Sequence, residues 1–379
     1  MLTRWCVNLL AVVALSVGGA AVAQTAPARV AAIGDSLSDE YAEQTYGAYA
    51  RSWTMGPRAQ GVAPLNYWGE PRRSGFENNW ARYAHTTDEA IVSQQHLGAA
   101  AAVTNDRADY VIIFIGGNDY APWAFGTYDE IYQNRWSSDQ IRAFGDTRIA
   151  NFRTMLDAIE PTGAGIVLAS IPDFTFMPFV WQSRNSLTAR ERVGAAMRDM
   201  STRVKMLARE RRVVFVDMHR YLRDLYGANP GVRTSIAVGG VSISMHVGTQ
   251  APAAGFVEDL AHPHTVMQSI MARVMVTALN GGFGAGLADL TESEHLAMAG
   301  LVYGGTDTLG AITQPVTTYV QNFGCVADFN LDRSVGVQDL FDFLTFYFIN
   351  DPKADLNGSG ISDVGDLFEF LPAYFTPCS

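Results

Sequence analysis

The sequence predicts an α/β protein built around a parallel sheet, because short apolar segments alternate with longer amphipathic ones. The apolar segments, which contain many β-branched residues, are 30–33, 109–115, 165–171 and 213–216. Continuous apolar runs of this length are typical of strands buried on both faces of a parallel sheet. The amphipathic stretches at 138–160 and 187–211 fit helices between those strands. The alternation therefore predicts right-handed crossovers and a doubly wound sheet.

Length, composition and charge narrow the class of protein. The chain has 379 residues, of which 48% are apolar and 17% charged. That is enough for one large domain or two domains with a substantial core. The formal net charge is −11, which argues against a nucleic acid as partner.

The first residues have the pattern of a secretory signal peptide, which we expect to span residues 1–23. Arg4 gives the positive start, residues 9–17 the apolar stretch, and Ala21-Val22-Ala23 the small-residue cleavage site. The apolar stretch is short for a membrane span, although a retained anchor remains the alternative. No later segment reaches spanning length, so we expect a secreted or cell-surface protein without a transmembrane segment in the mature chain.

The rest of the chain divides by composition into three parts. A main domain at 24–282 contains the alternating pattern and a hairpin expected at 234–247. A Gly- and Thr-rich connector at 283–324 holds one short helical stretch. The tail, residues 325–379, begins and ends with the two cysteines that remain after the signal, Cys325 and Cys378. An even pair in an exported protein predicts one disulfide.

Polar residues follow two of the expected strands, where a doubly wound sheet binds its ligands. Ser36 lies in Gly34-Asp35-Ser36-Leu37 after the first strand, and Asn118 lies in Gly116-Gly117-Asn118-Asp119 after the 109–115 strand. Asp259 and His262 precede the last long helical stretch. Gly, Asp and Ser also favour plain turns, and Asp259 could instead cap the helix that follows His262.

These residue types suit nucleophilic catalysis. A serine hydroxyl becomes a good nucleophile only when a base takes its proton, and His262 could be that base. Asp259 could bind the other imidazole nitrogen and hold its tautomer. The Asn118 side chain and the backbone N–H groups of Ser36 and Ala84 could stabilise a tetrahedral oxyanion.

With these residues in order, the chain resembles the GDSL family of serine esterases and lipases, also called SGNH hydrolases. The blocks that match are Gly34-Asp35-Ser36-Leu37, Gly116-Gly117-Asn118-Asp119 and Asp259-x-x-His262-Pro263, within 29–280. The resemblance implies a flavodoxin-like three-layer α/β/α fold, with Ser36 as nucleophile, His262 as base, Asp259 as its partner and Asn118 as oxyanion donor. It also implies an ester substrate, either an acylated glycan or a lipid-like ester, and no cofactor or metal in catalysis.

One family position is different in this chain. The oxyanion glycine of the second block falls on Ala84 when the block is aligned with residues 79–86, and His85 fills a usually small position. Ala84 can still donate its N–H if its backbone angle φ tolerates a Cβ atom. A non-catalytic surface or glycan-binding protein built on a decayed hydrolase domain is therefore the alternative, and acyl transfer in place of hydrolysis is a third.

The tail is acidic and contains an internal repeat. It has nine acidic residues against Arg333 and Lys353. Residues 339–348 match 366–375 at an offset of 27, and Asp328 and Asn330 recur as Asp355 and Asn357.

Each repeat places oxygen-bearing residues at the spacing of a calcium loop that enters a helix. The expected ligands are Asp328, Asn330, Asp332, Ser334 through its carbonyl and Asp339 in the first loop, and Asp355, Asn357, Ser359, Ile361 through its carbonyl, Asp363 and Asp366 in the second. The first loop has Arg333 rather than glycine at its sixth place. Two acidic helix N-caps are the alternative.

The paired loop–helix units resemble a dockerin domain, a small all-α module. This resemblance covers the tail and implies two bound Ca²⁺ ions and attachment to a cohesin-like or cell-surface partner. The two cysteines flank the repeats, so a disulfide could join the ends of the module.

Overall fold

A computed structural model of the chain describes residues 28–39, 78–123, 126–227, 231–249, 251–376 and 378. The expected signal peptide lies outside these residues. The strands are β1 (Val30–Gly34), β2 (Tyr110–Phe114), β3 (Gly165–Ala169), β4 (Val214–Val216), β5 (Ser235–Val238), β6 (Val241–Gly248), β7 (Ala254–Phe256) and β8 (Val320–Asn322). The α-helices are α1 (Thr87–Val92), α2 (Gln95–Thr104), α3 (Thr127–Tyr132), α4 (Ser138–Ile159), α5 (Pro178–Ser183), α6 (Leu187–Arg211), α7 (Met218–Tyr226), α8 (Thr265–Phe283), α9 (Glu292–Met298), α10 (Val337–Phe348) and α11 (Val364–Tyr374).

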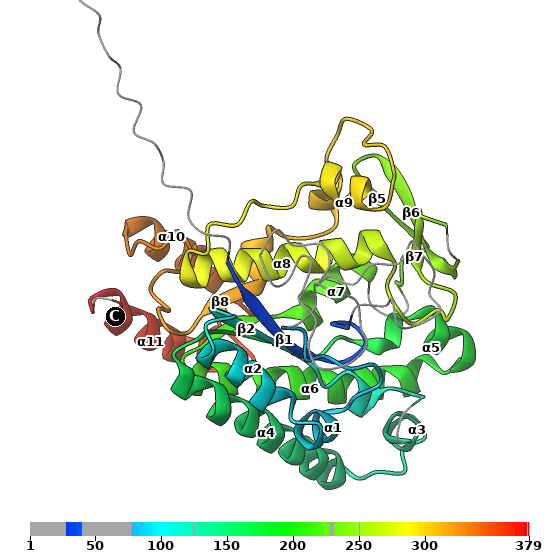
Figure 1. Cartoon of the computed structure of the whole chain (residues 1–379), viewed down its shortest axis with the longest axis horizontal. Helices are drawn as coiled ribbons and strands as arrows, with labels where there is room; N and C mark the ends of the chain where they lie inside the picture. Colours follow the sequence, from blue (N-terminus) through cyan, green and yellow to red (C-terminus); the bar gives the residue numbers. More distant parts are fainter. Residues whose placement is uncertain are drawn as a thin grey trace, which may run out of the picture.

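The predicted α/β architecture is confirmed. Strands β1 to β4 are adjacent in that order and parallel. Helices α2, α4 and α6 cover one face of this sheet, and α8 lies on the other (Figure 1). The strands are buried almost throughout, which is why their sequences are apolar on both faces rather than alternating.

The ends of the long helices agree with the sequence pattern. Helix α4 begins after Ser137, which forms a capping box with Gln140, and α6 begins after Ser186, whose side chain accepts the N–H of Ala189. Both arrangements satisfy N–H groups that have no partner within the helix. The confirmed helices therefore cross from β2 to β3 and from β3 to β4 on one face of the sheet.

The connector contributes more to the fold than expected. Its strand β8 pairs antiparallel with β4 and extends the sheet by one edge strand. The expected hairpin is confirmed as β5 and β6, which join through Gly239-Gly240 and pair antiparallel. None of the described helices is long and apolar enough to cross a membrane.

The tail has a small hydrophobic core of its own. Phe329, Phe343, Ala354, Leu356 and Phe370 form a cluster separate from the main core. The rings of Phe343 and Phe370, which are equivalent positions of the repeat, stack with centroids 4.2 Å apart and planes 2° apart. The two repeats thus pack against each other about this ring pair.

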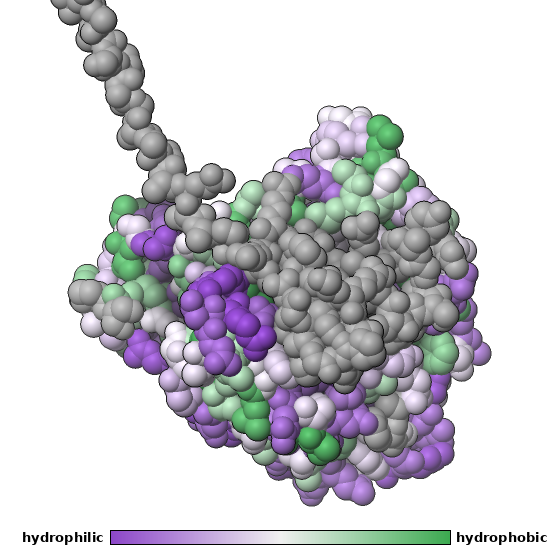
Figure 2. All heavy atoms as spheres, in the orientation of Figure 1, coloured by the Kyte–Doolittle hydropathy of each residue, from purple (hydrophilic) through white to green (hydrophobic). Residues whose placement is uncertain are grey.

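Polar contacts fasten the tail to the main domain. Arg220 of α7 makes two hydrogen bonds of 2.7 Å to the Asp351 carboxylate, and Arg209 of α6 pairs with Glu369 of α11. The other side of the tail exposes large apolar residues, and Figure 2 shows hydrophobic atoms at the end of the molecule that carries α10.

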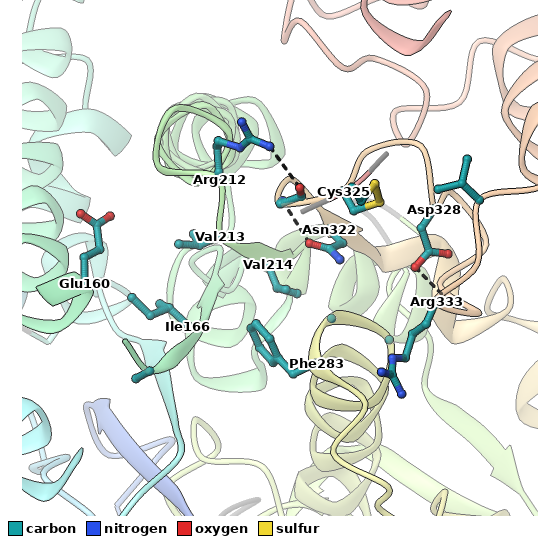
Figure 3. A pocket seen from close by; sticks show the side chains of 16 residues that line it. Glu160, Ile166, Arg212, Val213, Val214, Phe283, Asn322, Cys325, Asp328 and Arg333 are labelled. Carbon is teal, nitrogen blue, oxygen red and sulfur yellow. Dashed lines mark hydrogen bonds between the residues drawn. A yellow bond between two sulfur atoms is a disulfide. The ribbon is translucent and has the colours of Figure 1, made fainter. Parts of the chain in front are cut away.

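The predicted disulfide between Cys325 and Cys378 is present. It borders a cavity of about 740 Å³ at the amino ends of β3 and β4. Figure 3 shows Arg212 and Arg333 on different sides of this cavity, with Phe283 between them. Because Ser36 follows the carboxyl end of β1, this cavity lies at the opposite end of the strands from Ser36.

Candidate active site

Ser36 lies in a tight turn directly after β1. The carbonyl oxygen of Asp35 accepts the N–H groups of Ser38 and Asp39 at 3.0 and 2.9 Å. Gly34 is required at the start of this turn, because a Cβ atom there would lie 2.5 Å from the Ser38 Cβ and 2.8 Å from the Phe114 carbonyl oxygen. The turn brings Ser36 to the carboxyl edge of the sheet.

The structure brings Ser36, His262 and Asp259 together. The Ser36 Oγ lies 2.7 Å from the His262 Nε2, and the His262 Nδ1 lies 2.5 Å from the Asp259 Oδ2. The other carboxylate oxygen of Asp259 accepts the backbone N–H groups of Ala261 and His262, both at 2.9 Å. These bonds hold the carboxylate beside the imidazole while the imidazole faces the serine.

Burial alone would raise the pKa of Asp259, but its hydrogen bonds and charge interaction with His262 outweigh burial and lower it to about 2. The carboxylate is therefore ionised at neutral pH, as an imidazole-orienting group must be. The alternative that Asp259 caps the following helix is wrong, because the N-cap of α8 is His264. The His264 Nδ1 accepts the N–H of Thr265 at 2.8 Å.

The segment that contains Ala84 runs beside the strand that precedes Ser36. Residues 78–82 run beside β1, where the N–H groups of Trp80 and Arg82 bond to the carbonyl oxygens of Ala32 and Gly34 at 2.9 and 3.2 Å. This pairing carries Ala84 to the edge of the sheet at which Ser36 lies. Within the described residues, no hydrogen bond uses the backbone N–H of Ser36 or of Ala84.

Asn118 is held against the segment that contains Ala84. Its Nδ2 donates to the His85 carbonyl oxygen at 3.1 Å, and its Oδ1 accepts the indole N–H of Trp123 at 3.1 Å. Since a primary amide has two N–H donors, one hydrogen of Asn118 remains for a ligand. Trp123 fixes which end of the amide is the donor.

Further contacts fix the loops around Asn118. Asp119 accepts the backbone N–H and the hydroxyl of Thr87 at 2.9 Å each and pairs with Arg148 at 3.0 Å. Burial raises the pKa of Asp119 to about 6. The Gln95 side chain lies between Gly34 and His85. Its Oε1 accepts the Gly34 N–H at 3.0 Å, and its Nε2 lies 3.0 Å from the His85 Nδ1.

Sequence reasoning missed Trp123 and Gln95, whereas Tyr83 ends an aromatic stretch, residues 46–83, that the sequence left open as a substrate-binding wall or as ordinary packing. Tyr83 is half exposed, and its ring stacks on the ring of His262 with centroids 5.9 Å apart. No motif marks these residues, because their roles come from contacts between segments far apart in the chain. The one local sign in the sequence was that Trp123 follows Asn118 by five residues, which places it near the expected site.

Ala84 adopts a left-handed backbone conformation, with φ of 61°. An L-residue with a Cβ pays about 1–2 kcal/mol for this region, whereas glycine occupies it freely. We therefore expect Ala84→Gly to raise the free energy of unfolding by about 0.5–1 kcal/mol in chemical denaturation. Ala150→Gly, at an exposed position inside α4, is the matched control and should lose about 1 kcal/mol. A loss at both positions would contradict the assigned strain.

Asp35 is buried beside Ser36, and burial raises its pKa to about 7. The folded pKa lies above the unfolded value, so the contribution of Asp35 to stability is complete below about pH 4 and is lost as the pH rises through 7. Above pH 7 we expect Asp35→Asn to have a free energy of unfolding on the order of 2–4 kcal/mol higher than that of the wild type. The variant should also lack the fall in stability between pH 4 and 7. Denaturation midpoints from pH 4 to 9 test this, with Asp307→Asn at an exposed site as control; parallel profiles would contradict it.

The two tail loops have the same hydrogen-bond pattern at the offset of 27. The backbone N–H of the sixth place bonds to the first-place carboxylate, from Arg333 to Asp328 at 3.1 Å and from Gly360 to Asp355 at 3.0 Å. The sixth place has positive φ in both loops, 70° for Arg333 and 93° for Gly360. Arginine at the sixth place of the first loop thus occupies a backbone conformation that favours glycine, so the departure noted in the sequence has a conformational cost.

Both interpretations of the loops find support in these contacts. The Oδ1 atom of Asp328 is buried and has no hydrogen-bond partner among the described residues, which fits a loop that receives a cation. Asp339 and Asp366 accept the N–H groups of Gly336 and Asp363 at 2.8 and 2.9 Å, so they also act in helix caps. Among the described residues, no three His, Cys, Asp or Glu side chains are gathered in a geometry ready for a metal.

Solved structures that are similar to part of this chain include the following three. An acetyl xylan esterase from Geobacillus stearothermophilus is 19% identical over 66% of this chain and 94% of its own, with a TM-score of 0.36. Another variant of the same enzyme, described as an acetyl-xylooligosaccharide esterase, is 16% identical over the same shares, with a TM-score of 0.33. A Bacillus subtilis protein is 14% identical over 67% of this chain and 56% of its own, with a TM-score of 0.34. No curated protein matches the chain.

The family assignment comes from the sequence match. Residues 32–234 match the model of the GDSL-like lipase/acylhydrolase family, which is more than half of the chain. The matched region contains Ser36, Ala84 and Asn118, while Asp259 and His262 follow it. The sequence match and the α/β fold agree with each other. The chain is therefore an ester-bond hydrolase that belongs to the GDSL-like lipase/acylhydrolase family.

Proposed function

We propose that the protein is a secreted serine esterase that acts through an acyl-serine intermediate. The observation that carries the proposal is the continuous chain of contacts from the Ser36 Oγ to the His262 Nε2 at 2.7 Å and from the His262 Nδ1 to the Asp259 Oδ2 at 2.5 Å. A serine, an imidazole and an ionised carboxylate in this order are the groups that activate a hydroxyl for acyl transfer.

The reaction has two halves. In the first, His262 takes the Ser36 proton as the Oγ attacks the ester carbonyl, and then gives that proton to the leaving alkoxide as the carbon–oxygen bond breaks. In the second, His262 takes a proton from water, the hydroxide attacks the acyl-serine, and Ser36 leaves with the proton returned. The negative oxygen of each tetrahedral intermediate would be held by the N–H groups of Ser36 and Ala84 and the Asn118 amide.

We further propose that the ester belongs to an acylated carbohydrate. Tyr83 beside His262 and Trp123 beside Asn118 are 46% and 41% exposed, and both have a ring next to the reacting groups. Exposed aromatic rings at a binding site offer large, rigid apolar faces together with a polar group. Such rings suit one face of a sugar better than a flexible acyl chain.

Hydrolysis of an ester panel tests the proposal. We expect the wild type to hydrolyse p-nitrophenyl acetate and acetylated oligosaccharides faster than p-nitrophenyl esters of longer acids. Preference for long acyl chains would contradict the carbohydrate substrate but keep the esterase. Equal, slow hydrolysis of every ester by wild type and Asp259→Asn would support the non-catalytic alternative. Product analysis with added alcohols separates hydrolysis from acyl transfer.

For the tail, we propose a dockerin-like module that binds Ca²⁺ through its two loops and a cohesin-like or cell-surface partner through its helices. The orphan Asp328 Oδ1 supports the first loop as a cation site. Phe341 and Phe368, equivalent positions of α10 and α11, are 58% and 68% exposed, which supports a partner surface. Bound Ca²⁺ would order the loops and take no part in ester hydrolysis.

A further inference from the structure

A cavity of about 310 Å³ lies where the tail meets the main domain. We name it the seam cavity; its lining includes Arg198 and Lys205 of α6, His219, Arg220 and Arg223 of α7, and Asp355 of the second loop. None of the residues assigned to ester hydrolysis lines it. Its walls therefore come from two parts of the chain that are separate in sequence.

Two of the four cations in the seam cavity lack a carboxylate partner among the described residues. Arg220 pairs with Asp351, and Arg223 pairs with Asp173. The Lys205 Nζ instead donates to the carbonyl oxygens of Pro352 and Asp355 at 2.9 and 2.6 Å. Lys205 is only 7% exposed, so an ammonium is buried with neutral acceptors alone, which is costly.

Arg198 is the second cation without a partner. It is exposed at the cavity, and its guanidinium makes no hydrogen bond or ion pair with any described residue. An ammonium has three donors and a guanidinium five. Between them, Lys205 and Arg198 thus bring unused hydrogen-bond donors to one cavity, and the charge of Lys205 interacts at longer range with the Asp355 and Asp217 carboxylates.

His219 adds an unexplained polar group to the same cavity. It is 4% exposed, and neither ring nitrogen has a hydrogen-bond partner among the described residues. Buried polar atoms in native proteins are almost always hydrogen-bonded, so a side chain with two orphan nitrogens indicates a partner that the chain does not supply. A neutral imidazole offers one donor and one acceptor.

The carboxylates that line the seam cavity are already in use. Asp217 caps α7 by accepting the N–H of Arg220 at 3.0 Å, and Asp224 accepts the Tyr319 hydroxyl at 2.7 Å. Asp355 accepts two N–H groups of its own loop. These carboxylates therefore already accept hydrogen bonds, whereas Arg198 and both ring nitrogens of His219 have no hydrogen-bond partner among the described residues.

We propose that the seam cavity binds a small oxyanion, a phosphate or a carboxylate, through Lys205, Arg198 and His219. Liquid water occupies about 30 Å³ per molecule, so the cavity has room for an anion of four or five heavy atoms together with water. Because Lys205 also bonds to two tail carbonyls, the bound anion would strengthen the contact between tail and main domain. A carboxylate is also what ester hydrolysis releases, and this part alone rests on the proposed function.

Calorimetric titration of the full chain tests the proposal, with inorganic phosphate in one arm and acetate in the other. Calcium is left out of the buffer, since calcium phosphate precipitates. We expect one site for the anion. Its Kd should rise by about tenfold or more in Arg198→Ala and in Lys205→Met, because each variant loses a charge-assisted hydrogen bond. Arg142→Ala, an exposed arginine of α4, is the matched control and should bind as wild type. Binding of phosphate alone indicates free phosphate as the ligand, and tighter binding of acetate indicates the product.

Folding is checked separately, because Lys205 is buried. Arg198 is exposed, so Arg198→Ala should keep the wild-type melting temperature without anion while losing the rise that anion causes. His219→Phe, which keeps a ring of similar size, should also lose that rise. No heat from either anion with folded wild type, or binding that all three variants retain, would overturn the proposal. Neither result bears on Ser36, so failure here leaves the esterase intact.

Discussion

Replacing Ser36 with alanine is expected to lower kcat for p-nitrophenyl acetate by at least about 10⁴-fold, because the attacking oxygen is removed. His262→Ala should cost a similar factor, since in the proposed mechanism His262, 2.7 Å from the Ser36 Oγ, accepts the serine proton. The double variant should be no slower than either single variant, because groups that act as one unit are strongly non-additive. Steady-state kinetics with far-UV circular dichroism for folding measures all three.

Ser235→Ala is the matched control, an exposed serine at the start of β5, and should keep wild-type kcat. If the fold-reduction in kcat of the double variant equals the product of the two single reductions, Ser36 and His262 act in separate steps. Wild-type rates in Ser36→Ala would remove the acyl-serine proposal altogether. Mass spectrometry after rapid quenching should find the acyl group on wild type and none on Ser36→Ala.

Calcium is expected to have the second large effect, on stability rather than on rate. A ligand that binds only the folded state stabilises it by about 4 kcal/mol at a free concentration a thousandfold above Kd. Calorimetric scans of the full chain with Ca²⁺ should therefore show a higher melting temperature than scans with a chelator. The rise should shrink in Asp328→Asn and in Asp355→Asn, and vanish when both are combined.

The control is Asp342→Asn, a carboxylate of α10 outside both loops, which should keep the full response to Ca²⁺. Ester hydrolysis should not change when the chelator is added at a temperature where the chain stays folded. If Ca²⁺ releases no heat and moves no transition, the aspartates act as helix caps only. An equal response to Mg²⁺ would point to general screening of the acidic tail, because Mg²⁺ demands a tighter octahedral site.

Much of the main domain could be predicted because its signals are local. Runs such as 110–114 are buried on both faces of the sheet and so are apolar throughout. The turn at Gly34 depends on contacts with its own neighbours as well as with β2, and glycine marks it in the sequence. The 27-residue repeat was likewise visible in the sequence, whereas the stacking of its equivalent residues Phe343 and Phe370 is seen only in the structure.

Other features have no local signal. Strand β8 was expected to be part of a connector, because three residues between turns do not show which strand they will pair with. Trp123 was not singled out, because its indole N–H finds the Asn118 amide only in the folded loop. His219 lies among ordinary helix residues, and only the folded structure shows that its buried ring has no hydrogen-bond partner among the residues described.

The sequence by itself determined the fold class, the residue types of the site and the order in which they occur. It could do so because periodicity and the Asp259-x-x-His262 spacing act over a few residues. Only the tertiary structure decided that Ser36 meets His262, 226 residues away, that Ala84 takes a left-handed angle and that the tail leaves an ammonium buried beside a cavity. These outcomes depend on how β1, the loop before α8 and the tail pack together, and long-range packing leaves no mark within any short stretch of chain.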